Sequence, residues 1–184
     1  MPEAETGEKY VLTLNDKSSR YLWAYSLFTV SAEEVCDKLM DHFLIYNPPI
    51  QISCDQGSAF KSRVSTLMCE RAGVMLQFSN AFSPFSTGTE SCHSILAQRI
   101  KSCSMMGYNV RGWTKILKFL VAGINLLPKG HKTTITPFEC LFGVRKKEPL
   151  DVLVKNPFAD EFPTLKNFEE ARKLVNMAKT NEYR

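Results

Sequence analysis

The chain has 184 residues, of which 44% are apolar, and this size and composition fit one packed domain. Lysine and arginine total 23 against 19 acidic residues, a net charge of +4 that permits contact with nucleic acid without indicating it. No run approaches the length of a membrane-spanning helix, and the N-terminus has no apolar signal region, so we expect a soluble, non-secreted protein, nuclear or cytoplasmic. Six separated cysteines without a C-x-x-C pair indicate reduced thiols, not a disulfide framework or a zinc site.

The first predicted elements are two strands joined by a polar turn. Residues 10–14, "YVLTL", and 21–28, "YLWAYSLF", are rich in aromatic and branched side chains. The intervening "NDKSSR" supplies turn-forming residues, so the pattern predicts an antiparallel pair.

A helix and a short strand come next. In "SAEEVCDKLMDHFLIY", Ser31 and Glu34 have the spacing of a capping box, and apolar residues recur at helical intervals. Asn47-Pro-Pro ends this helix because proline cannot continue its hydrogen bonds. The strand "IQISC" then places Asp55 at its C-terminal end.

The remainder is predicted to be mainly helical. Residues 60–72 form a helix, "VMLQF" a strand and "SNAFSPFSTGTE" a loop, and further helices are expected over 90–105, 111–126, 137–142 and 167–180. This order argues for a mixed α/β sheet covered by helices. In such sheets functional groups gather at the carboxyl ends of strands, where Asp55 lies.

Four stretches in order carry a resemblance to a known family: "YVLTLNDKSSRYLWAYSL", "AEEVCDKLMDHFLIYNPPIQISCDQGSAFKS", "SPFSTGTES" and "TPFECLFG". They resemble the catalytic core of retroviral and retrotransposon integrases, most closely the gypsy type. The resemblance implies an RNase H-like core over residues 1–150, with a mixed sheet flanked by helices, followed by a helical extension over 151–184. It also implies two-metal phosphoryl transfer by three carboxylates, since a carboxylate cluster is what holds two Mg²⁺ ions together.

The resemblance assigns the three carboxylate positions unevenly. Asp55 matches the second carboxylate, but the family's spacing to the third lands on Ser91, one residue after Glu90. In the family, the first carboxylate lies on an opening strand. The matching region of this chain, "MPEAETGEK", offers only Glu3 and Glu5. Asp16 matches a turn residue that the family does not use for metal, and Ile95 and Gln98 are neutral where the family often presents lysine to DNA. Asp55 and Glu90 are therefore interpreted as vestiges of a catalytic set.

Structural roles compete with functional ones at each of these positions. Asp55 could instead cap the following helix or accept a hydrogen bond in its turn. His93 and Cys92 lie where a substitute ligand or a nucleophile could stand, but residues of these types more often pack. The aromatic residues Trp23, Trp113 and Phe43 are interpreted as core or interface residues rather than as platforms for bases.

The sequence thus predicts an integrase-like domain, domesticated and catalytically inactive, that acts in dimerisation or in binding another protein. It requires no cofactor, and its affinity for nucleic acid is weak or absent. The proposed homodimer uses Val35, Leu39 and Phe43 of the helix over 32–46, with residues 137–142 as a second surface. Two alternatives remain: an active Mg²⁺-dependent DNA-joining enzyme whose first Asp lies outside this sequence, and a non-specific nucleic-acid-binding domain that uses the basic loops over 129–132 and 145–147.

Overall fold

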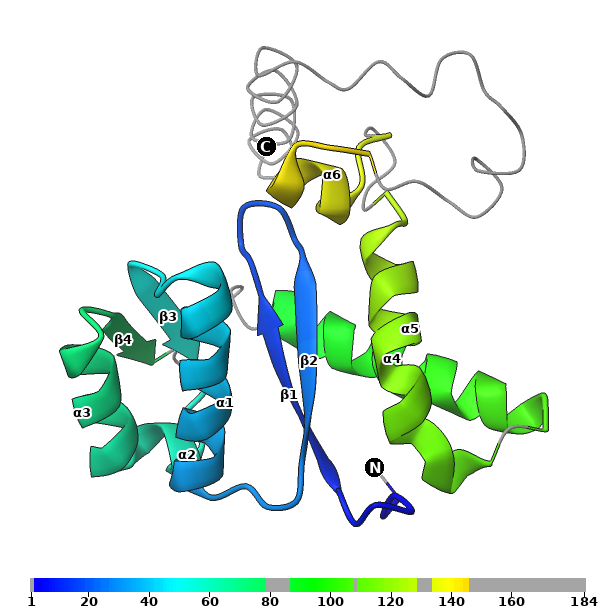
Figure 1. Cartoon of the computed structure of the whole chain (residues 1–184), viewed down its shortest axis with the longest axis horizontal. Coiled ribbons are helices and arrows are strands. Elements are labelled where there is room, and N and C mark those ends of the chain that lie inside the picture. The colour runs from blue at the N-terminus through cyan, green and yellow to red at the C-terminus, as the bar shows by residue number, and fades with distance from the viewer. Residues whose placement is uncertain (1, 79–86, 108, 129–133, 146–184) are drawn as a thin grey trace. The chain divides into compact units, whose positions relative to one another are not determined.

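The structure is a computed structural model that describes residues 2–78, 87–107, 109–128 and 134–145. The side chains of residues 87–91 and 104 are outside this description. Figure 1 shows the helices and strands of the described residues. The chain divides into two compact units. The first consists of Met1–Thr13 and Ala24–Lys118, and the second of Leu14–Trp23 and Phe119–Arg184. The expected boundary between residues 150 and 151, and the helix expected over 167–180, lie outside the described residues.

The predicted strand pair is confirmed. Strands β1 (Tyr10–Asn15) and β2 (Leu22–Leu27) are neighbours in a two-stranded sheet. The Lys9 N–H donates to the Leu27 carbonyl and the Asp16 N–H to the Tyr21 carbonyl, both at 2.9 Å, as an antiparallel pair requires. In the turn, the Asp16 carboxylate accepts hydrogen bonds from the backbone N–H and the hydroxyl of Ser19, each at 2.6 Å. Asp16 therefore stabilises the turn.

Helix α1 (Ala32–Tyr46) begins at the predicted cap. The Ser31 hydroxyl accepts a hydrogen bond from the Glu34 N–H at 3.2 Å. The Glu34 carboxylate does not complete a capping box, because it accepts from the backbone N–H groups of Phe28 and Thr29 instead. These bonds fasten the helix to the chain that leaves β2.

One predicted helix is two in the structure. After β3 (Gln51–Cys54), the chain forms α2 (Ser58–Lys61), α3 (Arg63–Arg71) and β4 (Met75–Phe78). Ser62 separates the two helices because its backbone is extended, with ψ of 151°, and its hydroxyl accepts a hydrogen bond from the Ser65 N–H at 3.1 Å. A serine that satisfies a free N–H in this way ends one helix and starts the next. Helix α1 packs on α2 and α3, and α3 packs on β4 (Figure 1).

The strands do not form the single mixed sheet that the sequence predicted. Strands β3 and β4 pair in parallel, with Gln51 opposite Met75, and the described residues contain this sheet and the β1–β2 sheet as separate two-stranded sheets. No residue of β3 or β4 is fully buried. This exposure is unusual because parallel sheets are normally covered on both faces.

The helical half of the prediction is confirmed with shifted ends. Helix α4 (Thr87–Met105) begins inside the predicted loop, and α5 (Trp113–Asn125) follows the short 3₁₀ helix η1 (Val110–Gly112). Helix α6 (Pro137–Phe142) has a complete capping box, in which Thr136 accepts from the Glu139 N–H and Glu139 accepts from the Thr136 N–H. It ends at Gly143, whose φ of 71° favours glycine.

The residues named as an interface lie in the core. Val35, Leu39 and Phe43 are 2%, 3% and 5% exposed, so α1 uses them to pack within the chain. The apolar side chains that α1 leaves exposed are Met40, Leu44, Ile45 and Tyr46. All six cysteines lie in the described residues, and no disulfide joins them: Cys36, Cys54, Cys69, Cys92, Cys103 and Cys140.

A buried histidine on α1 makes the stability of the fold depend on pH. The Nδ1 atom of His42 lies 2.8 Å from the Tyr25 hydroxyl, and burial lowers the pKa of the imidazole. Above the usual histidine pKa of about 6.5, His42 is neutral in both the folded and the unfolded state, so it does not reduce the free energy of unfolding. Below it the unfolded state gains protons that the folded state resists, so the free energy of unfolding should fall.

Urea denaturation of the whole chain between about pH 7 and pH 5 tests this prediction. The variant His42→Gln should show a flatter dependence on pH across that range, because the group with the lowered pKa is then absent. An unchanged slope in the His42 variant would contradict the assignment.

Candidate active site

Asp55 follows the last residue of β3 and is exposed. Its Oδ1 atom accepts a hydrogen bond from the Gly57 N–H at 3.0 Å, so the carboxylate closes the turn that leads to α2. A Cβ atom at Gly57 would lie 3.0 Å from this same oxygen, which explains why glycine fits here. This hydrogen bond is one of the two structural roles that the sequence suggested for Asp55, the other being a cap of the following helix. Gly57 occupies the N-cap position of α2, and no side chain forms a capping hydrogen bond there.

The neighbouring thiol is unsuited to nucleophilic chemistry. Burial raises the pKa of Cys54 to about 11, and the negative charge of Asp55 and the nearby Cys69 add to the shift. A thiol with so high a pKa stays protonated at neutral pH. Cys54 therefore offers neither a thiolate nucleophile nor a ready metal ligand.

The third carboxylate position lies near the start of α4. Glu90 and Ser91 both belong to this helix, and their side chains are outside the described part of the structure. Two residues further on, His93 Nε2 lies 2.9 Å from the Thr13 hydroxyl on β1, and Cys92 is 4% exposed. His93 thus connects α4 to β1, and Cys92 packs in the core. Among the residues that the structure describes, no three His, Cys, Asp or Glu side chains form a group able to hold a metal ion.

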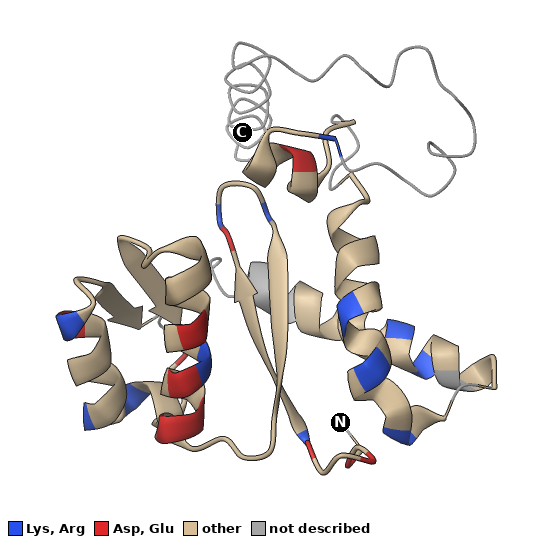
Figure 2. Ribbon diagram, in the orientation of Figure 1, with Lys and Arg blue, Asp and Glu red and all other residues tan. Residues whose placement is uncertain are grey.

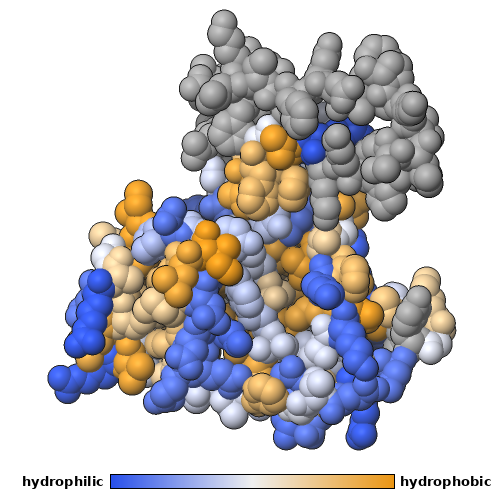
Figure 3. Space-filling view, in the orientation of Figure 1, coloured by the Kyte–Doolittle hydropathy of each residue, from blue (hydrophilic) through white to orange (hydrophobic). Residues whose placement is uncertain are grey.

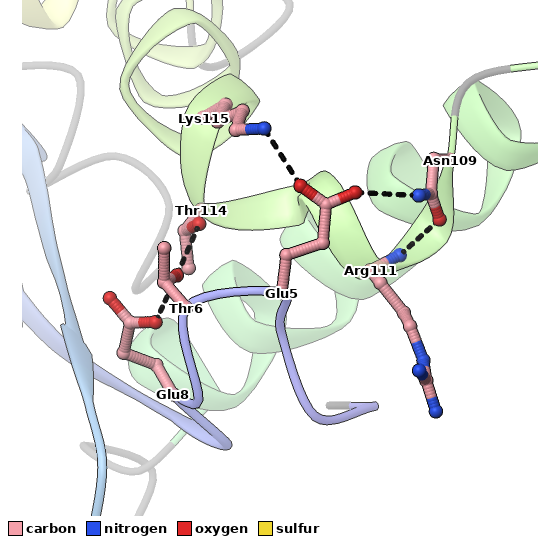
Figure 4. A network of polar contacts seen from close by, with 7 residues as sticks. All are labelled: Glu5, Thr6, Glu8, Asn109, Arg111, Thr114 and Lys115. Atoms are coloured by element: carbon pink, nitrogen blue, oxygen red, sulfur yellow. Dashed lines mark hydrogen bonds and ion pairs between the residues drawn. The ribbon is translucent and has the colours of Figure 1, made fainter.

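The two carboxylates offered for the first position are bound to cationic partners. Glu5 accepts a hydrogen bond from the Lys115 ammonium and another from the Asn109 amide, both at 2.7 Å (Figure 4). The Lys115 hydrogen bond, with its positive charge, lowers the pKa of Glu5. Glu3 forms an ion pair with Lys9 at 3.4 Å. Both carboxylates therefore have structural partners.

The same N-terminal segment is fastened by backbone contacts that sequence analysis did not find. The Glu5 N–H donates to the Arg111 carbonyl at 2.9 Å, and Trp113 Nε1 donates to the Pro2 carbonyl at 2.9 Å. Ala4, which lies between Pro2 and Glu5 in the sequence, is 5% exposed. No local pattern could reveal these bonds because their partners are more than a hundred positions apart in the chain.

Charge is distributed unevenly over the described helices. Acidic residues lie along α1, and lysine and arginine are found on α4, η1 and α5 (Figure 2). The basic residues of these three helices are Arg99, Lys101, Arg111, Lys115 and Lys118. The two basic loops named from the sequence lie almost entirely outside the described residues, where only Arg145 is placed. These side chains are candidates for contact with phosphates, although α2 and α3 also carry basic residues, namely Lys61, Arg63 and Arg71.

The chain is similar to several known proteins. Residues 2–84 match the family described as "Integrase core domain". The Gag-Pol polyprotein of avian reticuloendotheliosis virus is 28% identical over 149 residues, which are 79% of this chain and 12% of that polyprotein. The retrovirus-related Pol polyprotein from transposon 412 of Drosophila melanogaster is 24% identical over 186 residues, covering all of this chain and 14% of that protein.

The chain is similar to this family over residues 2–84, which are less than half of its length. It spans only a small part of the curated relatives that it matches. The catalytic core of BIV integrase superposes on 70% of the chain, covering 82% of that core, with a TM-score of 0.57 at 17% identity. A chain of the simian T-cell lymphotropic virus intasome, solved in complex with the PP2A regulatory subunit B56 gamma, superposes on 80% of this chain. The match covers 55% of that neighbour, with a TM-score of 0.64 at 15% identity. These likenesses confirm the predicted RNase H-like fold.

No helix in the described part of the chain is both long and apolar enough to cross a bilayer.

Proposed function

We propose that this chain is an integrase-like domain that is catalytically inactive and acts as a dimerisation or protein-interaction module. The observation that carries the proposal is the state of the carboxylates that the chain offers. Asp55 closes a turn, and Glu5 and Glu3 are paired with lysines. Two-metal catalysis requires several carboxylates that converge on both ions, and a single aspartate cannot hold them.

Metal binding tests the inactive state directly. Isothermal titration of the whole chain with Mn²⁺ should show no binding of two ions at about micromolar affinity, because two of the three ligands that such a pair needs are engaged or replaced. The variant Ser91→Glu alone should not create such binding, since the first carboxylate would still be lacking.

The matched control is Asp55→Asn, which removes the charge of the remaining candidate ligand and keeps an oxygen that can accept from Gly57. Its titration should equal that of the parent. Binding of two ions by the parent that disappears in this variant would overturn the proposal and favour an active enzyme whose first Asp lies outside this sequence.

The proposed dimer contact is the exposed apolar surface of α1. Met40, Leu44 and Ile45 are 42%, 79% and 70% exposed, and apolar side chains gather over the C-terminal end of this helix (Figure 3). Ile50, 87% exposed, follows directly after the helix. Clustered apolar groups of this kind mark contact surfaces, and a twofold contact is the commonest way for identical chains to cover them.

Light scattering on the purified chain tests this contact. The parent should have a mass near twice 20.9 kDa, and Leu44→Glu should shift it toward the monomer because a charge would be buried at the interface. The same substitution at Leu67, exposed on α3, should leave the dimer intact. A parent that is a monomer at every accessible concentration, and that captures no partner, would remove the interaction-module proposal.

A nucleic-acid-binding role is favoured by one separate observation, the basic residues on α4, η1 and α5. The expected affinity for DNA is weak and falls as salt is added, because few phosphate contacts are available. Fluorescence anisotropy with a labelled duplex at about 0.15 M salt decides this alternative, since a sub-micromolar dissociation constant would favour it over the interaction module.

A further inference from the structure

The Glu5 carboxylate is held by two donors at the start of η1 and α5. Asn109 Nδ2 donates to Glu5 Oε1 and Lys115 Nζ donates to Oε2, both at 2.7 Å (Figure 4). The Arg111 N–H donates to Asn109 Oδ1 at 3.0 Å, so the amide is oriented with its Nδ2 toward the carboxylate. Two donors that converge on two oxygens of a carboxylate can hold two oxygens of a phosphate in the same way.

More positive charge lies around these donors than one carboxylate neutralises. Arg111 is exposed, and its guanidinium extends away from Glu5 (Figure 4). Lys118 is exposed about one turn after Lys115 on α5. Lys115 keeps 70% of its side chain exposed while it is paired with Glu5. This surface can therefore accept further negative charge from outside the chain.

The other acidic residues near the N-terminus have different partners. Glu3 forms an ion pair with Lys9, and Glu8 accepts a hydrogen bond from the Thr6 hydroxyl. Among the contacts of the described residues, Glu5 is thus the carboxylate that lies on Lys115.

Glu5 can leave these donors at small cost. Its side chain is 40% exposed, and an ion pair between exposed groups contributes little to stability. The bond from the Glu5 N–H to the Arg111 carbonyl does not involve the carboxylate, so the N-terminal segment stays attached when the side chain turns away. The carboxylate is therefore a replaceable occupant.

We propose that Asn109, Lys115 and Arg111 form a binding site for the phosphate groups of a polyanion, and that Glu5 closes this site as an intramolecular competitor. A group joined to the chain has an effective concentration of about a millimolar, so a single free carboxylate or phosphate ion displaces it poorly. A run of phosphates displaces it, because its other groups contact Arg111 and Lys118 at the same time. Nucleic-acid strands and inorganic polyphosphate both carry such runs.

The first test measures the affinity of the whole chain for a fluorescein-labelled DNA duplex, by anisotropy over a range of salt concentrations. Glu5→Ala should bind at least about fivefold more tightly than the parent, and the slope of log K against log salt should steepen by about one, because one more phosphate is neutralised. Glu3→Ala is the matched control, since it changes the net charge equally but releases Lys9. Its affinity should change by less than about twofold, with the slope of the parent. Equal affinities and slopes of the two variants would overturn the proposal.

The second test asks whether Lys115 is masked by Glu5. Lys115→Gln should change the affinity of the parent by less than about twofold, but in the Glu5→Ala chain it should remove the whole gain. Lys61→Gln, on α2, should have the same effect in both backgrounds. Equal effects of Lys115→Gln in the two backgrounds would contradict the competition.

Unlabelled polyphosphate then identifies the source of the phosphates. If it displaces the duplex from the Glu5→Ala chain at equal phosphate concentration, the phosphates alone are recognised. A duplex that resists this displacement assigns the site to nucleic acid, and both results support the site. These readouts are independent of the proposed inactive, dimeric function, because neither Mn²⁺ binding nor the mass of the chain enters them.

Discussion

Replacing Trp113 with alanine is expected to lower the free energy of unfolding by about 3–5 kcal/mol. Trp113 is the largest fully buried side chain, at 0% exposure, and its removal leaves a cavity that the surrounding residues cannot close. Its indole N–H also donates to the Pro2 carbonyl, so the substitution detaches the N-terminal segment. Urea denaturation followed by circular dichroism measures the loss.

Two variants separate the packing of Trp113 from its hydrogen bond. Trp113→Phe keeps most of the buried ring and loses only the bond to Pro2, so the expected cost is about 1–2 kcal/mol. Phe119→Ala changes a 67% exposed aromatic residue on the same helix and should cost less than about 1 kcal/mol. A Trp113→Ala variant as stable as the Phe119 control would contradict the burial of the indole.

Replacing Asn125 with leucine is expected to destabilise the fold by about 2–4 kcal/mol. Asn125 is 1% exposed, and its amide forms two hydrogen bonds of 2.8 Å with Leu22, accepting from the N–H and donating to the carbonyl. The side chain thus acts as a partner strand would at the first residue of β2. Leucine has a similar volume, so the loss reports the two buried backbone groups that remain without a partner.

The same substitution at Asn109 provides the control. The Asn109 side chain also accepts from a backbone N–H, that of Arg111, and donates to a side chain, but it is exposed. Water replaces these bonds in the variant, so Asn109→Leu should cost less than about 1 kcal/mol. Equal losses at the two positions would show that burial does not determine the effect.

The sequence by itself predicted the elements whose signals are local. Ser31 was predicted to cap α1, and the structure contains its bond to the Glu34 N–H. The position of Asp55 after a short strand was also predicted. These predictions succeed because a capping bond or a strand end depends on residues only a few positions apart.

Sequence analysis failed where the deciding bond is not local or where two local signals compete. Ser62 ends one helix and begins another, although the apolar spacing across it favours a single helix. The expected single sheet is two sheets because strand pairing depends on which edges meet, and a strand's own sequence does not record this.

The sequence by itself determined the fold class and the position of the candidate aspartate after β3. Only the tertiary structure decided what the candidate side chains contact. Glu5 is bound by Lys115, Trp113 by Pro2, and Leu22 by Asn125, in pairs separated by 110, 111 and 103 positions. Such contacts form when distant segments pack together, and burial then removes the water that would otherwise satisfy each group, so the partner becomes necessary.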